Sequence, residues 1–131
     1  MNYLAVVVAG LAATVLGAIW YSPGLFGKAW MEGIGKTKEQ IDADFSVMKI
    51  VGAFIGYLIA AYGIARIMDW SGGGNLGSGV IVGLLAAICF AAATSGVSEL
   101  MEGRPSKVFV VNSLYNIVAF AVMGAIVGVW R

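Results

Sequence analysis

Histidine is absent from this sequence and cysteine occurs once, at Cys89, so the commonest metal ligands and nucleophile–base pairs are missing. A single thiol has no disulfide partner in the chain and no imidazole or second thiolate with which to bind zinc. Charged residues make up only 11% of the 131 residues, and a net charge of +1 gives no electrostatic basis for binding nucleic acid. We therefore expect no catalytic residues, no metal, no cofactor and no nucleic-acid partner, and we predict that the chain is not an enzyme.

Long uncharged runs are the dominant feature of the chain, 60% of which is hydrophobic. They cover residues 1–27, 50–65, 76–98 and 108–130. A helix that crosses a bilayer needs about 20 apolar residues. The second run is shorter, but the long side chains of Lys49 and Arg66 at its ends can reach the interface. We predict an all-α integral membrane protein with one domain, residues 1–131, and four transmembrane helices at about 2–21, 47–68, 77–99 and 107–130.

The basic residues are unevenly divided between the two ends of these helices. The connections between helices 1 and 2 and between helices 3 and 4, with their flanks, hold Lys28, Lys36, Lys38, Lys49, Arg104 and Lys107. The opposite side holds only Arg66 and Arg131. Basic residues favour the cytoplasmic side, so we predict that both connections are cytoplasmic and both termini are outside. The first run lacks a basic leader and a cleavage site, so we expect it to be retained as a helix.

An unusual segment, W-Y-S-P-G-L-F-G-K-A-W at residues 20–30, follows the first apolar run. We call it the elbow. Its aromatic side chains are typical of a membrane interface, and Ser22 could cap a short helix that begins at Pro23. The apolar spacing predicts a short amphipathic helix between helices 1 and 2. Thr37 and Gln40 have the spacing of a capping box for a second one. The elbow residues that we single out are Trp20, Ser22, Pro23, Phe26, Lys28 and Trp30.

Small residues recur along one face of each long helix. In lipid, apolar helices gain packing energy mainly through close backbone approach at such residues. On helix 3 they form a ridge at intervals of four residues, from Gly79 to Ser95. There are more of these faces than one four-helix bundle needs, so we predict a homo-oligomer. The residues expected to mediate helix packing are Gly52, Gly56, Gly79, Gly83, Ala87, Gly124 and Gly128.

A few polar residues fall at membrane depth on the side of the elbow. Burying such groups is costly unless they hydrogen-bond to one another or line a wet cavity. One hypothesis is therefore a shared polar pocket under the elbow, formed by Tyr21, Glu99, Asn112, Tyr115 and Asn116. The alternative is that Glu99 pairs with Arg104 or Lys107 at the interface, that the asparagines fix helix register, and that the elbow is only an anchor.

The sequence also resembles a known family. The elbow segment, with Gly35 and Thr37, and a later pattern carry the likeness, which covers nearly the whole chain. The later pattern is Gly103-Arg104-Pro105, Asn112, Tyr115, Asn116, Met123-Gly124 and Trp130. Together they are similar to small bacterial membrane proteins catalogued as domain of unknown function 1761. The resemblance implies a four-helix, multi-pass protein of the bacterial cytoplasmic (inner) membrane, and it implies no established activity.

Two classes of function remain open from the sequence. The first is an oligomeric channel or small-solute transporter, in which Glu99 and the asparagines would contact a small solute or ion. The second is a non-catalytic accessory or scaffold protein that binds lipid or a larger membrane partner through its small-residue faces. Small multidrug carriers also have four helices in a short chain. Their functional carboxylate lies inside helix 1, however, and helix 1 has none here.

Overall fold

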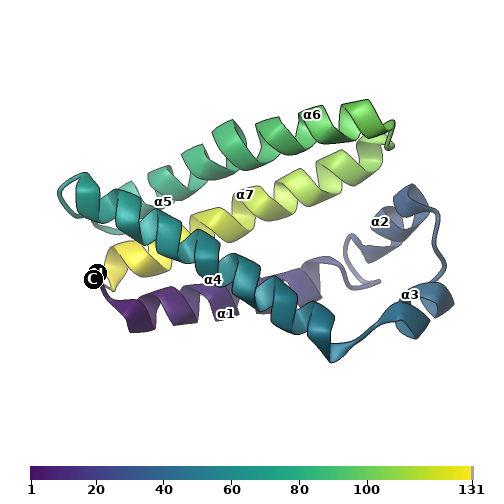
Figure 1. The fold of residues 1–131 in the computed structure, drawn as a ribbon, viewed down its shortest axis with the longest axis horizontal. Coiled ribbons are helices and arrows are strands. Elements are labelled where there is room, and N and C mark those ends of the chain that lie inside the picture. Colours follow the sequence, from purple (N-terminus) through teal and green to yellow (C-terminus); the bar gives the residue numbers. More distant parts are fainter. Residues whose placement is uncertain (131) are drawn as a thin grey trace.

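The structure, a computed structural model, describes residues 1–130, which form a bundle of long helices with two short helices at one end (Figure 1). The first two spans are α1 (Tyr3–Trp20) and α4 (Val47–Trp70). The third is continuous through α5 (Leu76–Leu85), η1 (Ala86–Ala92) and α6 (Ala93–Glu102), and the fourth is α7 (Ser106–Val129). All four are long and apolar enough to cross a membrane. The predicted fold class is therefore confirmed.

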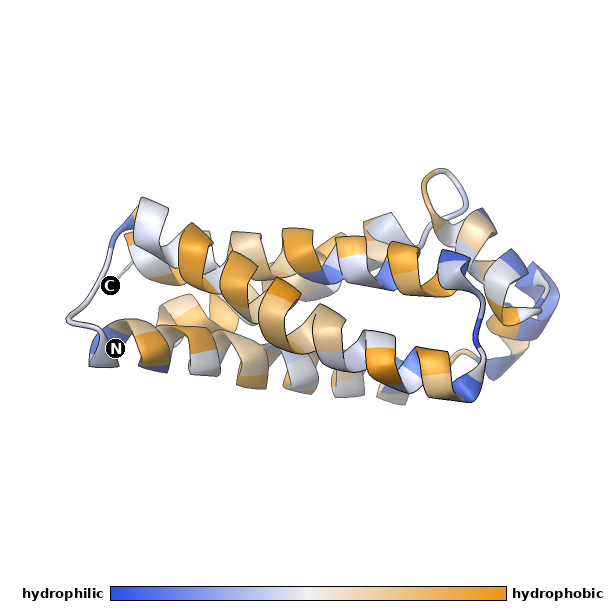
Figure 2. Cartoon of the chain, turned by 90° about the horizontal axis from the view of Figure 1, so that it is seen from above, coloured by the Kyte–Doolittle hydropathy of each residue, from blue (hydrophilic) through white to orange (hydrophobic). Residues whose placement is uncertain are grey.

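The two ends of the bundle differ in character. The short helices α2 (Gly27–Ile34) and α3 (Lys38–Asp44) lie at one end, which we call the elbow end. At the opposite, terminal end, α1 begins and α7 ends (Figure 1). Hydrophobic residues cover most of the long helices, and hydrophilic residues gather around the elbow end (Figure 2). The short helix expected between the first two spans is present as α2.

The packed core lies mainly between α1, α4 and α7. Many of its members are alanines, which allow the helix backbones to approach closely because their side chains occupy little space. Met68 and Met123 fill the gaps between them and are fully buried. The buried residues of this core are Ala5, Val6, Ala9, Ala13, Ala61, Ile64, Ala65, Met68, Tyr115, Ala119, Met123 and Val127.

Glycines bring α5 and α7 into direct backbone contact. A Cβ atom added to Gly79 would collide with the carbonyl group of Gly124, and one added to Gly124 would collide with that of Gly79. Gly83 faces the carbonyl of Phe120 in the same way, and Gly128 faces that of Asn75. At these four positions, a side chain larger than hydrogen would force the two helices apart.

The glycines of α4 lie in a different environment. Gly52 and Gly56 are exposed, and a Cβ atom on either would meet no atom within 4 Å. The structure therefore does not place these two residues in packing contacts within the chain. Their role in packing stays a prediction about contacts between chains.

The middle of the third span is a π-helix, η1, with one more residue per hydrogen-bonded turn than an α-helix. Such a segment rotates less per residue, so positions four apart stay nearer to one face. Gly79, Gly83 and Ala87 are buried before and within η1, and Ser95 and Glu99 of α6 line a cavity after it. The four-residue ridge thus keeps facing the interior along the span.

The turn between α1 and α2 differs from the sequence-based expectation. Ser22 does not cap a helix that starts at Pro23, because α2 begins at Gly27. The Ser22 hydroxyl donates to the carbonyl of Ile19 at the end of α1, and the Ser22 carbonyl accepts from the amides of Leu25 and Gly27. The hydroxyl and the carbonyl of Ser22 therefore stabilise a tight turn after α1 and do not begin a helix at Pro23. The capping box predicted at Thr37 and Gln40 is confirmed at the start of α3.

Candidate functional site: a cavity under the elbow

The elbow is fastened to the first half of α7 by side-chain contacts. The indole nitrogen of Trp20 donates to the carbonyl of Val111 at 3.2 Å, and the Tyr21 hydroxyl donates to Oδ1 of Asn112 at 2.6 Å. In α2, Glu32 forms an ion pair with Lys107 at 3.1 Å. These contacts hold the elbow against α7.

The remaining elbow residues lie around this attachment. The ring of Phe26 packs on Trp20, with centroids 4.5 Å apart, and Trp30 packs on Tyr21. Pro23 and Lys28 are exposed, and Ser22 closes the turn through its bond to α1. Trp20, Tyr21 and Trp30 are therefore partly buried, whereas Phe26 covers Trp20 from the exposed side and the proline and the lysine are exposed.

A cavity of about 1080 Å³ lies under the elbow, between α4, α6 and α7. The structure brings the five residues of the predicted pocket to its wall from three separate parts of the chain. They are Tyr21, Glu99, Asn112, Tyr115 and Asn116. The fold therefore assembles the shared cluster in space.

Glu99 is the most unusual member of the cluster. Its Oε2 atom is buried and has no hydrogen-bond partner within residues 1–130. The pairing considered from the sequence is not formed in that range, because Arg104 pairs with Glu102 at 3.0 Å and Lys107 pairs with Glu32. The helix also continues to Glu102, so Glu99 lies one turn inside the end of the span. A carboxylate oxygen is thus withheld from both water and protein donors.

Aromatic rings form a continuous wall of the cavity. Tyr21 contacts Trp30 at 5.2 Å and Tyr115 at 5.5 Å between ring centroids, and Tyr57 of α4 contacts Tyr115 at 5.8 Å. Tyr115 is also anchored to α1, since its hydroxyl donates to the Ala13 carbonyl at 2.6 Å. The rings are therefore fixed in place by α1 and α7 before any solute binds.

The bond between Tyr21 and Asn112 has a defined direction. The Tyr21 hydroxyl is the donor, because the amide oxygen of Asn112 can only accept. This bond uses one lone pair of that oxygen and leaves the amide nitrogen of Asn112 as a donor.

Charges at the mouth of the cavity are largely paired. Lys36 lies 3.6 Å from Asp44, and Arg104 is paired with Glu102. Lys49 lines the mouth as well and has no ion-pair partner in the described part of the chain. Among the described residues, the wall thus combines a carboxylate that has a buried oxygen without a partner and, at the rim, an ammonium group without an ion pair.

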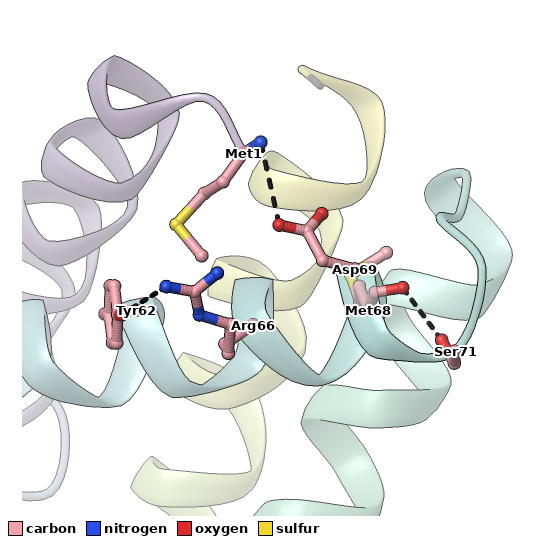
Figure 3. Close-up of polar contacts among 6 residues, drawn as sticks. All are labelled: Met1, Tyr62, Arg66, Met68, Asp69 and Ser71. Carbon is pink, nitrogen blue, oxygen red and sulfur yellow. Dashed lines mark hydrogen bonds and ion pairs between the residues drawn. The ribbon is translucent and has the colours of Figure 1, made fainter.

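Polar groups at the terminal end form a separate set of local contacts (Figure 3). Arg66 donates to the Tyr62 hydroxyl at 2.9 Å, and the amino group of Met1 lies 3.6 Å from Asp69. Ser71 donates to the carbonyl of Met68 at 2.9 Å. These groups satisfy one another, in contrast to Glu99.

Residues 4–128 match the family described as Protein of unknown function (DUF1761). The chain belongs to this family. Comparisons with curated proteins and with solved structures found no match. The resemblance seen in the elbow segment and the later pattern is therefore confirmed over nearly the whole chain.

Sequence reasoning missed the contribution of α4 to the DUF1761 cavity. Tyr57, Ala53 and Lys49 line it from this helix. The sequence does contain an indication of this contribution, since Tyr57 is one of two side chains with a hydroxyl in the apolar run 50–65. Ser95 was noted only as part of the packing ridge, and it lines the cavity one turn before Glu99.

Proposed function

We propose that this DUF1761 protein is a small-solute transporter whose binding site is the cavity under the elbow. The observation that carries this proposal is Glu99, which lines a cavity of about 1080 Å³ and whose Oε2 atom is buried without a hydrogen-bond partner in the described residues. An ionised carboxylate without partners is expensive to bury, so such a group is typical of a site that a ligand or proton completes. The volume slightly exceeds the range of about 300–1,000 Å³ that is common for pockets that bind small organic molecules, so a molecule of that size fits.

A carrier fits the single chain better than a channel. Toward the terminal end the cavity meets Tyr115, Ala119 and Met123, each at most 1% exposed. A solute that enters from the elbow end therefore meets a packed core, and passage requires a rearrangement of helices. A pore along the chain axis would need this core to be absent, so a channel function would depend on a path between chains of an oligomer.

The proposal includes an orientation in the bacterial inner membrane. With the basic connections in the cytoplasm, the elbow end and the mouth of the cavity face the cytoplasm as well. The site in this conformation would then exchange solute with the cytoplasm.

An accessory or scaffold role is the second candidate, and the exposed glycine face of α4 favours it. Gly52 and Gly56 leave room for another helix to approach the backbone. In that case the cavity would have no transported ligand, and removal of the Glu99 charge would not alter any solute flux.

Ligand-induced stabilisation of the purified protein tests the transporter proposal. A panel of small cationic, zwitterionic, anionic and neutral metabolites is screened by thermal unfolding against the wild type, Glu99→Gln and Glu39→Gln. Glu39 is an exposed carboxylate on α3 and serves as the matched control. We expect at least one compound to raise the Tm of the wild type and the control but not that of Glu99→Gln.

Counterflow in proteoliposomes then follows the stabilising compound. Uptake that depends on Glu99 supports transport. The proposal fails if no compound distinguishes the wild type from Glu99→Gln. It also fails if a compound binds at Glu99 and is never moved across the bilayer, and this second result would favour the accessory role.

A further inference from the structure

We propose that the cavity under the elbow is an organic-cation site, in which a substituted ammonium group lies beside Glu99 and against the rings of Tyr21 and Tyr57. This inference names the substrate class of the proposed function and rests on it for transport, whereas the binding claim can be tested alone.

The charge inside the cavity selects the sign of the ligand. Glu99 lines the cavity, and one oxygen of its carboxylate is buried with no donor in the described residues, so a cation or a donor that enters is attracted and an anion is repelled. The mouth does not reverse this preference, because Lys36 and Arg104 are neutralised by Asp44 and Glu102. Lys49 is the one cation at the rim without an ion-pair partner in the described residues.

The aromatic wall selects an organic cation. The face of an aromatic ring carries negative potential, and several rings around one site are the usual way to recognise alkylated ammonium groups. Here Trp30, Tyr21, Tyr115 and Tyr57 succeed one another at centroid distances of 5.2 to 5.8 Å along the same cavity. The bond from Tyr115 to Ala13 keeps the wall in place without using the ring faces.

A bare metal ion matches the cavity less well. Calcium and magnesium take about six or more oxygen ligands, and the second carboxylate of the cavity, Glu102, already pairs with Arg104. The amide oxygen of Asn112 already accepts a hydrogen bond from the hydroxyl of Tyr21, which leaves it one lone pair. A volume of about 1080 Å³ leaves room for an alkylated ammonium group and its carbon substituents.

The test compares choline and benzyltrimethylammonium with their neutral isosteres, in which a quaternary carbon replaces the nitrogen. Binding to the full chain in lipid nanodiscs is followed by calorimetry. We expect each cation to bind at least about tenfold more tightly than its isostere, since only the cation interacts with Glu99 and the ring faces. Glu99→Gln should lower cation affinity by at least about tenfold and leave the isosteres unchanged.

Substitutions in the wall separate ring recognition from hydroxyl chemistry. Tyr57→Phe keeps the ring and should retain cation binding, whereas Tyr57→Leu should weaken it several-fold. Lys49→Gln should raise cation affinity, because it removes a like charge from the rim. Asp42→Asn on exposed α3 is the control for a carboxylate outside the cavity.

The outcomes distinguish this inference from the proposed function. Equal binding of cations and isosteres to the wild type, or no binding of either cation, overturns the inference even if Glu99→Gln does not fold. Glu99-dependent binding and transport of an anion, a neutral solute or a metal ion also overturns it but leaves the proposed function standing. Cation binding without counterflow supports the inference and contradicts transport.

Discussion

At the scale of single residues, Tyr115 joins the core of the bundle to the cavity. It is 1% exposed, its hydroxyl reaches the Ala13 carbonyl, and its ring contacts Tyr21 and Tyr57. Gly17 makes this position possible, because a Cβ atom there would lie 3.1 Å from the Tyr115 hydroxyl oxygen. One aromatic side chain therefore sets the depth at which the apolar core ends and the cavity begins.

This arrangement predicts coupling between Gly17 and Tyr115. Tyr115→Phe should lose one hydrogen bond, worth about 0.6 kcal/mol on average inside a membrane. Gly17→Ala should cost stability in the wild type because the added methyl group displaces the hydroxyl, and it should cost less in the Tyr115→Phe background. A double-mutant cycle of unfolding free energies measures the difference. Strictly additive effects would contradict the contact.

Some of this residue-scale detail could be read from the sequence. The polar groups at membrane depth are few, and an unsatisfied polar group is costly in lipid, so these groups are expected to cluster. Glu99, Asn112 and Asn116 were identified for that reason. Tyr57 was missed because an apolar run does not reveal which side of its helix faces a polar neighbour. That information depends on how α4 crosses the other helices.

At the scale of elements, the chain contains two kinds of glycine face. The face shared by α5 and α7 is closed by backbone contact at Gly79 and Gly124, whereas the face of α4 at Gly52 and Gly56 is open. Sequence alone could not separate them, because the same spacing occurs on each helix. The helices themselves were predictable, since a backbone in lipid must satisfy its hydrogen bonds within each span. The residue at which α2 begins was not predictable, because it depends on the hydrogen bonds of the turn at Ser22.

Replacing a glycine by leucine should have different effects on the two faces. Gly83→Leu should destabilise the bundle by about 1–3 kcal/mol or more, because the side chain collides with the Phe120 carbonyl. Gly56→Leu should change the stability of the single chain little and should disrupt the predicted homo-oligomer. Thermal unfolding and native mass spectrometry in mild detergent measure the two effects. A wild type that is monomeric under these conditions contradicts the oligomer prediction.

At the scale of the whole molecule, polarity is distributed unequally between the two ends of the bundle. Hydrophilic residues gather around α2 and α3 (Figure 2), and the cavity opens at the same end. The positively charged connections coincide with this end, so orientation in the membrane decides which compartment reaches Glu99.

Cysteine labelling tests the orientation. In a Cys89→Ser background, Lys38→Cys on α3 should react with an impermeant maleimide only after the cytoplasmic side is opened. Gly73→Cys, in the connection after α4, should react in intact cells. Labelling of Lys38→Cys from the periplasm would reverse the proposed orientation of the cavity, and equal labelling of both sites from both sides would indicate dual topology.

The π-helix in the third span has a consequence for insertions and deletions. A π turn is an α-helical turn with one residue inserted, so deleting one residue from η1 would restore the regular helix and still leave a span of ample length. Because the wider turn already absorbs the extra residue, this deletion would leave the side chains of α6 on nearly the same side of the axis relative to α5. Deleting one residue from the regular helix between Ala93 and Ser98 would instead turn Glu99 by about 100° and remove it from the cavity wall, while the glycine contacts of α5 stayed intact. The third span therefore tolerates the loss of a residue only within η1, a constraint that its composition does not reveal.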